Sequence, residues 1–187
     1  MFLISDKTLS CAEHLALEEM LFSMSEDFIL LYMHDKALVV GKHQNTYKEI
    51  NVPKAIEFNI PYYRRITGGG TVYHDRGVLN FSLVKSITLP LQDEVLFFLH
   101  VLVDFFQKHG LTISIGSRRE LLWNERKISG TAQHLRKNRL LFHGTLLIDA
   151  NLDLLHLLLK KQDHRYVDKK LNSVPSPLIN LKEAKKY

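Results

Sequence analysis

The stretch Arg64-Arg65-Ile66-Thr67-Gly68-Gly69-Gly70-Thr71-Val72-Tyr73-His74-Asp75 is the part of this sequence that says most about the fold and its site. Three of the nine glycines stand together in it, between two predicted strands, 61–66 and 71–74. Consecutive glycines let the backbone take positive φ angles and let successive N–H groups surround an anion. Arg64 and Arg65 add charged donors for a phosphate or carboxylate. The residue types alone fit an anion-binding loop and a flexible hairpin with solvated arginines about equally, since no Gly-Lys-Ser/Thr ending follows.

Two further segments carry side chains suited to chemistry. In Arg126-Lys127-Ile128-Ser129-Gly130-Thr131-Ala132, a lysine in a β-rich run fits a pocket-facing cation that stabilises developing negative charge. A lysine on the solvent face of a strand is the commoner case. In Phe142-His143-Gly144-Thr145, a single histidine before an apolar run is more often structural than catalytic. The spacing of His43, His74, His134 and His143 is unlike that of metal ligands, so we expect no metal site built by the protein.

Around these segments, short β-rich runs alternate irregularly with helical ones. Ser10, with Glu13 three residues on, predicts a capped helix over 11–24. Further helices are predicted at 51–58, 92–109 (closed by Gly110) and 152–160, and strands at 28–32, 37–40, 61–66, 71–74, 80–84, 113–115, 121–123, 126–129 and 140–148. Strands joined by hairpins, without regular βαβ alternation, indicate the α+β class.

Composition limits the possible functions. A chain of 187 residues that is 45% hydrophobic and 24% charged is typical of one folded domain. The net charge of +5 comes entirely from residues 160–187, so it gives no reason to expect nucleic acid. The most apolar run, 95–106, is interrupted by His100 and Asp104, and no signal peptide is recognisable, so we expect a cytoplasmic protein without a membrane span. Cys11, the only cysteine, excludes an intramolecular disulfide and a cysteine-built zinc site.

In this order and at these separations, the three segments resemble the lipoate–protein ligase family. The resemblance covers nearly the whole chain, since it also includes Leu3-Ile4-Ser5-Asp6, Leu15-Ala16-Leu17-Glu18-Glu19, Val40-Gly41-Lys42-His43-Gln44-Asn45, Ser173-Val174-Pro175-Ser176 and Asn180-Leu181. It implies an α+β domain with a mixed, mainly antiparallel sheet flanked by helices, as in biotin and lipoate ligases. We expect residues 1–187 to form this one catalytic domain, with 160–187 as a basic C-terminal segment and without the family's accessory C-terminal domain.

The family joins lipoate to a lysine of a lipoyl domain in two steps. Lipoate and ATP give lipoyl-adenylate and pyrophosphate, and the acceptor amine then displaces AMP. The resemblance implies ATP with Mg²⁺ and lipoate as substrates, and acceptors such as 2-oxoacid dehydrogenase E2 subunits or the glycine cleavage H protein, with a possible separate accessory subunit. It assigns Lys127 as the catalytic cation, Arg65 to the mouth of the lipoyl pocket and His143 to the acyl tunnel. The residues it implies in lipoate or ATP binding are Arg65, Gly68, Gly69, Gly70, Thr71, Val72, His74, Asp75, Lys127, Ser129, Gly130 and His143.

Two positions depart from the family pattern and keep alternatives open. Val78 stands where the family has an asparagine that resembles a phosphate contact, and Arg119 replaces another polar partner of the nucleotide. One alternative is a related acyltransferase that moves octanoyl or lipoyl groups through a cysteine thioester. That reaction needs an activated thiolate, and Cys11 lies in a predicted helix away from His143. The other alternative is a non-catalytic relative that binds lipoyl groups or lipoyl domains without adenylation.

Overall fold

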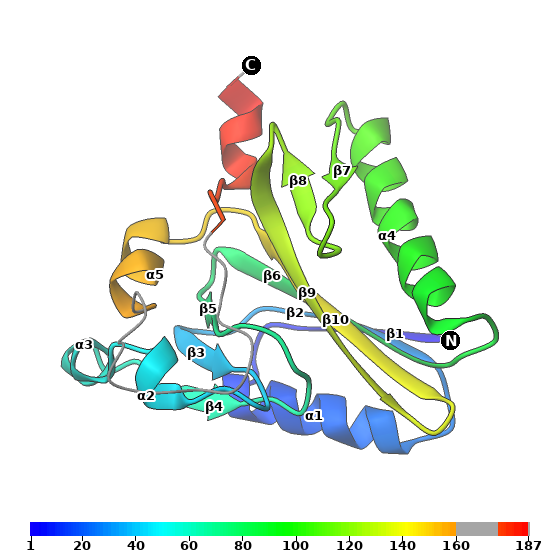
Figure 1. Cartoon of the computed structure of the whole chain (residues 1–187), viewed down its shortest axis with the longest axis horizontal. Coiled ribbons are helices and arrows are strands. Elements are labelled where there is room, and N and C mark those ends of the chain that lie inside the picture. The colour runs from blue at the N-terminus through cyan, green and yellow to red at the C-terminus, as the bar shows by residue number, and fades with distance from the viewer. Residues whose placement is uncertain (160–175, 187) are drawn as a thin grey trace.

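A seven-stranded sheet forms the larger part of the structure, a computed structural model that describes residues 1–159 and 176–186 (Figure 1). Its strand order is β1-β2-β6-β10-β9-β8-β7, and all neighbours are antiparallel except β1 and β2. The bounds are Phe2–Asp6 for β1, Phe28–Tyr32 for β2, Val78–Ser86 for β6, Ser114–Ile115 for β7, Leu121–Trp123 for β8, Arg126–Arg136 for β9 and Arg139–Leu147 for β10. The expected mainly antiparallel α+β fold is confirmed.

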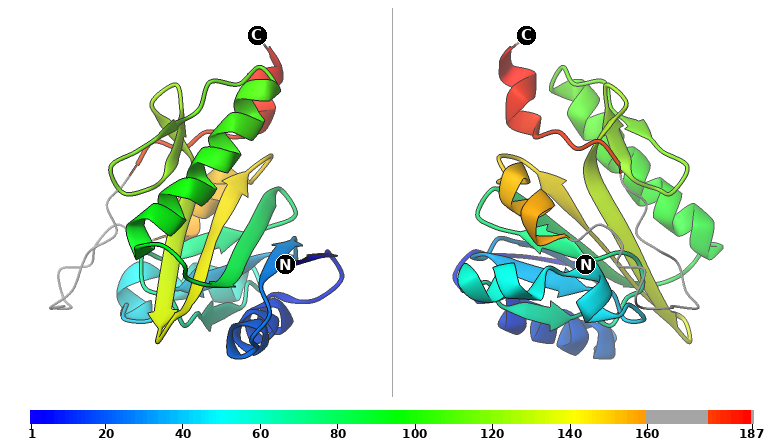
Figure 2. Two further views of the ribbon diagram at one scale, coloured as in Figure 1. Left: turned by 90° about the vertical axis from the view of Figure 1, so that its right-hand side faces the viewer. Right: turned by 60° about the vertical axis from the view of Figure 1, so that its left-hand side comes forward.

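Two helices cover the opposite faces of this sheet. Because successive strand side chains point to opposite faces, Leu140 and Phe142 of β10 join the cluster under α4 (Leu91–Lys108), whereas Leu141 joins the cluster under α1 (Cys11–Ser23). Figure 1 shows α4 and α1 on either side of the strands, and the left view of Figure 2 shows α4 crossing in front of the strands. The sheet is therefore buried on both faces along β6 and β10.

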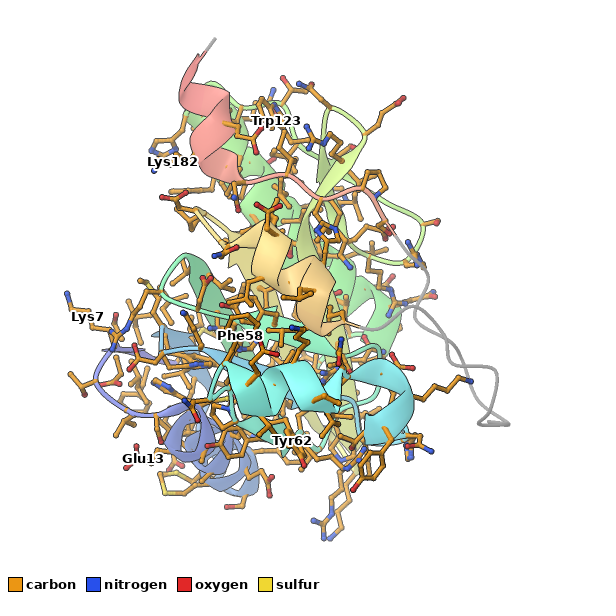
Figure 3. All side chains as sticks on the ribbon, turned by 90° about the vertical axis from the view of Figure 1, so that its left-hand side faces the viewer. Lys7, Glu13, Phe58, Tyr62, Trp123 and Lys182 are labelled. Carbon is orange, nitrogen blue, oxygen red and sulfur yellow. The ribbon has the colours of Figure 1, made fainter. Side chains whose placement is uncertain are left out.

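A second, three-stranded sheet has the order β4-β3-β5, with bounds Tyr62–Arg64, Ala37–Val40 and Val72–His74. One of its faces packs against α1, and the other packs against α3 (Val52–Glu57) and α5 (Leu152–Leu158). The short helix α2 (Thr46–Glu49) precedes α3. Figure 3 shows Phe58 and Tyr62 in this half of the molecule, and Trp123 and Lys182 at the far end. Because β4 and β5 are the two outer strands of the small sheet, the loop between them connects its two edges.

Local sequence signals place several element ends as expected. Ser10 and Glu13 form a capping box at the start of α1, and Asn51 caps α3. Gly110, with φ of +81°, follows the last turn of α4. The β8–β9 hairpin turns at Asn124 and Glu125, which both have positive φ. These ends are set by hydrogen bonds within a few residues, so they can be predicted from sequence alone.

Other elements differ from the expectations. Strand β1 and helix α2 do not correspond to any element predicted from the sequence. Strand β9 continues to Arg136 instead of ending at Ser129. β9 is longer because it pairs with β10 along its length, from Leu146↔Ser129 to Arg139↔Arg136, so a partner strand supports residues of low β-propensity. The helix expected over 152–160 ends at Leu158, and Lys160 lies outside the described residues.

Part of the basic C-terminal segment packs onto the body, while 160–175 and 187 lie outside the described residues. Leu178 forms a bridge with Lys127 of β9, and Ile179 and Leu181 are buried in the core under α4. The segment ends in a 3₁₀ helix, η1 (Leu181–Lys186). Residues 176–181 are therefore an integral part of the fold. None of the described helices is long and apolar enough to cross a membrane.

Candidate functional site

The glycine-rich loop between β4 and β5 is organised around the side chain of Arg65. This side chain is 6% exposed, and its guanidinium donates to the carbonyls of Gly68 (2.6 Å), Gly70 (2.8 Å) and Val39 (3.0 Å) and to Thr67 Oγ1 (2.8 Å). Burial lowers the pKa of Arg65 to about 10, so the group remains charged at neutral pH. Because its guanidinium donates to carbonyl groups of the loop, Arg65 fixes the backbone conformation of the loop from its buried side.

A second loop, residues 41–46, is tied to the glycine loop. Lys42 N donates to Thr67 O (2.9 Å), and Thr71 Oγ1 donates to Gln44 Oε1 (2.9 Å). Arg64 donates to the carbonyls of Gly41 and Gln44, both at 2.8 Å. The stretch Gly41–Asn45, which carries part of the family resemblance, therefore forms one structural unit with the glycine loop.

A buried chain of polar side chains connects the glycine loop to α1. The Thr67 hydroxyl lies 2.8 Å from His143 Nε2, and His143 Nδ1 lies 3.0 Å from Glu18 Oε1. Ser82 and Tyr32 also donate to Glu18. Burial by itself would raise the pKa of Glu18, but His143 and the hydrogen bonds to the carboxylate outweigh it, and the pKa is lowered. Glu18 is thus a buried anion that orients His143 beneath the loop.

Lys127 supplies a partly buried cation to this region. Its side chain is half-buried on β9, and its Nζ has no hydrogen-bond or ion-pair partner within residues 1–159 and 176–186. A Cβ built on Gly130 would lie 3.0 Å from this Nζ, so the ammonium rests against the Gly130 backbone. Burial and the charge of Arg118 lower the pKa of Lys127, whereas Glu120 raises it. Within the same described residues, Ser129 Oγ is also buried without a hydrogen-bond partner.

Strand β9 carries Lys127 and also passes beneath the glycine loop. Ala132 of β9 lies under Gly69, since a Cβ on Gly69 would be 3.7 Å from the Ala132 Cβ, and His143 pairs with Ala132 across the sheet. The three sequence segments are therefore neighbours in the fold: the glycine loop lies over β9 and β10, and Lys127 lies farther along β9. The site combines backbone N–H groups, an ammonium without a hydrogen-bond partner among the described residues, and a buried His–Glu pair.

Arg119 and Val78 are the two departures from the family pattern, and Arg118 precedes the first of them. Arg119 has a φ of +64° and donates to Gln133 Oε1 (3.0 Å) of β9, while its carbonyl accepts from Thr131 (3.0 Å). Arg118 donates to Ser176 Oγ (2.7 Å). Val78 is fully buried in a small apolar cluster, so its side chain contributes to packing. Arg118 adds positive charge near Lys127.

The side chains of His74 and Asp75, two expected binding residues at the end of the segment 64–75, form hydrogen bonds outside the glycine loop. His74 Nδ1 lies 3.1 Å from His34 Nε2. The Asp75 carboxylate accepts from Gly77 N (2.8 Å) and from Asn151 N (3.0 Å), the residue that caps α5. These contacts hold β5 to the rest of the fold, and a direct contact of His74 or Asp75 with substrate stays a prediction.

Gly68 and Gly70 are held through their carbonyls by Arg65, and Thr71 is held by Gln44. Val72 packs on the face of the small sheet that contacts α1. Cys11 is buried at the first turn of α1, and burial, followed by the charge of Glu18, raises the pKa of its thiol to about 12. A buried thiol with so high a pKa lacks the thiolate that an acyl-enzyme mechanism needs.

Sequence reasoning missed Glu18, Thr67 and Gln44 as members of the site. Glu18 lies in the stretch Leu15–Glu19 that carried part of the resemblance, but no local signal shows that its carboxylate meets His143, 125 residues later. A buried acidic side chain needs a polar partner, since an unpaired buried charge is costly, but α1 has no clear apolar stripe in its sequence that would show Glu18 to be buried.

Comparison with known proteins finds sequences similar to this chain among lipoate–protein ligases. A family model described as the lipoyl protein ligase A/B catalytic domain matches residues 10–186. Lipoate–protein ligase 1 of Staphylococcus aureus is 34% identical over 183 residues, which are 96% of this chain and 55% of that protein. Lipoate-protein ligase LplJ of Bacillus subtilis is 32% identical over 173 residues, 92% of this chain and 50% of that protein. The chain thus spans about half the length of these curated relatives.

Solved structures agree with this grouping. A bi-partite lipoate protein ligase from Thermoplasma acidophilum, described with its E2 lipoyl domain, has a TM-score of 0.80 at 29% identity, covering 88% of this chain and 67% of that chain. A lipoate-protein ligase A bound with ATP has a TM-score of 0.78 at 27% identity, covering 85% and 70%. Protein Ta0514 of T. acidophilum with bound lipoic acid has a TM-score of 0.79 at 27% identity, covering 90% and 78%.

Proposed function

This chain belongs to the lipoyl protein ligase A/B catalytic-domain family, and on that basis we propose that it activates lipoate with ATP and transfers the lipoyl group to a lysine of a lipoyl domain. In the first step a lipoate carboxylate oxygen attacks the α-phosphorus of ATP, and pyrophosphate leaves. In the second step the acceptor amine attacks the acyl carbonyl carbon, the bond to phosphate breaks and AMP leaves. Solved relatives bound to ATP and to lipoic acid support both substrates.

The observation that carries this proposal is the half-buried ammonium of Lys127, which has no partner in the part of the chain that the structure describes. Both steps build negative charge, first on the phosphate and then on the acyl oxygen. A cation already desolvated and held against the Gly130 backbone stabilises such charge more than a solvated one, because it needs little reorganisation during the reaction. Lys127 is therefore the catalytic cation of the proposal.

The glycine loop would hold the adenylate. Its backbone lies over β9 and β10, and Arg65 already holds the carbonyls of Gly68 and Gly70, which leaves loop N–H groups for phosphate oxygens. The His143–Glu18 pair lies beneath the loop, on the α1 side of the sheet, where we place the acyl chain. Ser129, whose buried hydroxyl lacks a partner among residues 1–159 and 176–186, would donate to substrate.

The partners of the reaction follow from the same proposal. Mg²⁺ would enter as part of the ATP complex, since it is bound mainly through phosphates and water. The acceptors would be lipoyl domains of 2-oxoacid dehydrogenase E2 subunits or the glycine cleavage H protein. The bi-partite T. acidophilum relative supports an accessory subunit that works with this chain.

Single-turnover adenylation tests the proposal. The protein is incubated with lipoate, ATP and Mg²⁺, and lipoyl-adenylate is measured by mass spectrometry alongside pyrophosphate release. Lys127→Ala should lower the rate by about 10²–10³-fold, as loss of one charge-stabilising donor does, whereas Lys108→Ala, on the exposed end of α4, should not change it. Lipoate binding without adenylate would instead favour the non-catalytic alternative, and normal turnover of Lys127→Ala would remove the role assigned to this lysine.

A further inference from the structure

Three side chains that can ligate metals come together beneath the small sheet, away from Lys127. Cys11 is the first residue of α1, His34 lies between β2 and β3, and His74 ends β5. One ligand atom from each of the three lies within 4.8 Å of the other two. Their side chains are nearly closed to solvent, with exposed fractions of 5%, 1% and 5%. Thiol and imidazole groups together are the donors that zinc prefers.

The hydrogen bonds of the two histidines determine where their lone pairs point. His34 Nδ1 lies 2.8 Å from the carbonyl oxygen of Asp35, an acceptor, so this nitrogen carries the proton and His34 Nε2 carries a lone pair. His74 Nδ1, 3.1 Å away, then donates to that lone pair. His74 Nε2 is left with a lone pair, and it is buried without a hydrogen-bond partner in residues 1–159 and 176–186. A ring held by a backbone carbonyl is the usual arrangement of a metal-ligating histidine.

A third imidazole, that of His14, lies beside the cluster and also has one ring nitrogen without a proton. His14 is fully buried, its ring lies 5.7 Å from that of His34, and its Nε2 lies 3.1 Å from Asp6 Oδ1. The carboxylate accepts from Nε2, so His14 Nδ1 also carries a lone pair, and it too is buried without a partner among the residues that the structure describes. Unpartnered buried polar atoms are costly, and the lone pair on His74 Nε2 is available to a bound cation, whereas His14 lies outside the group of ligand atoms.

We propose that Cys11, His34 and His74 bind one thiophilic divalent cation of the zinc class. Ligand atoms around tetrahedral zinc are about 3.3–3.6 Å apart when Zn–N is about 2.0–2.1 Å and Zn–S about 2.3 Å, so the three ligand atoms, which lie within 4.8 Å of one another, must move closer together. To bind the metal, His34 Nε2 gives up the hydrogen bond that it accepts from His74 Nδ1. Binding forms a bond from the metal to the Cys11 sulfur, and the thiol proton leaves to solvent. A water molecule completes the fourth position. Mg²⁺ does not compete, because it prefers oxygen ligands.

The site differs from what the sequence spacing led us to expect, since three ligands drawn from α1, the β2–β3 connection and β5 form no local motif. A cation here would join the first turn of α1 to the strand that follows the glycine loop. It would therefore stabilise the folded chain, because a ligand that binds only the native state raises the unfolding temperature. This proposal does not depend on the proposed ligase activity.

Cobalt and zinc titrations of the whole chain test the site. Co²⁺ should bind at one equivalent with a thiolate-to-cobalt charge-transfer band and intense tetrahedral d–d bands, zinc should displace it, and Zn²⁺ should raise the unfolding temperature. Cys11→Ala should abolish the band, and His34→Ala should weaken Zn²⁺ binding about 100-fold or more, since loss of even an outer partner costs about 10–100-fold. His100→Ala, an exposed histidine on α4, is the matched control and should bind as the wild type does.

Two results would overturn the proposal. Wild-type protein that binds Co²⁺ without a thiolate band does not use Cys11, and this readout requires no variant to fold. Cys11→Ala and His34→Ala variants that bind Zn²⁺ as tightly as His100→Ala would show that zinc binds elsewhere on the chain. Circular dichroism of each variant confirms that the comparison is made between folded proteins.

Discussion

Replacing Gly69 by alanine should affect the proposed site far more than the matched change at Gly110. Both glycines have positive φ, +88° and +81°, so both substitutions introduce a left-handed alanine at a cost of about 1–2 kcal/mol. At Gly110 the new Cβ meets nothing within 4 Å. At Gly69 it lies 3.0 Å from Arg65 Nη2. This guanidinium is held by four hydrogen bonds and has little freedom to move.

The difference between the two variants isolates the contact with Arg65. Backbone strain and the lost flexibility of the unfolded chain are common to both and cancel. Weakening one hydrogen bond of a charged group costs about 1.5–3 kcal/mol, so Gly69→Ala should lose that much more unfolding free energy than Gly110→Ala. In thermal unfolding each kcal/mol corresponds to about 2–4 °C for a chain of this size.

Urea unfolding of the two variants and the wild type measures this difference, and the adenylation assay measures its effect on the site. We expect Gly110→Ala to retain wild-type adenylation and Gly69→Ala to lose most of it, because the loop carbonyls move with Arg65. Equal unfolding free energies for the two variants, together with normal adenylation by Gly69→Ala, would refute the view that Arg65 shapes the loop.

Three further substitutions test other parts of the structure. Thr67→Val removes the hydroxyl shared by Arg65 and His143 and should lower the unfolding free energy by about 1–3 kcal/mol; calorimetry that shows no change would contradict this link. Burial opposes ionisation of Glu94, but its hydrogen bonds lower its pKa from 4.5 to about 2, so the stability it adds is complete above pH 4.5 and lost as pH falls toward 2. Glu94→Gln should therefore cost roughly 2–3 kcal/mol at pH 7 and less on acidification, as urea titrations at several pH values would show. Ser10→Ala removes the capping box of α1 and should cost about 1 kcal/mol in urea unfolding.

The elements that sequence reasoning predicted well are those whose ends depend on near neighbours. The capping box at Ser10, the positive-φ Gly110 and the turn at Asn124 satisfy or redirect the backbone within a few residues, so their signals are local. Strand β1 and the second half of β9 were missed because they are strands only by pairing with β2 and β10. Such pairing depends on distant partners and overrides the local β-propensity.

The same division applies to the site. The sequence by itself determined the fold class, the family resemblance and the side chains available for chemistry: the glycines at 68–70, Lys127 and His143. Only the tertiary structure decided which of these side chains come into contact and which partners they bind. It turned Arg65 into the anchor of the loop, set Glu18 against His143 and left Lys127 Nζ without a partner in residues 1–159 and 176–186. The physical reason is that burial makes an unpaired charge or lone pair costly, and only packing decides which groups become buried and which partners they meet.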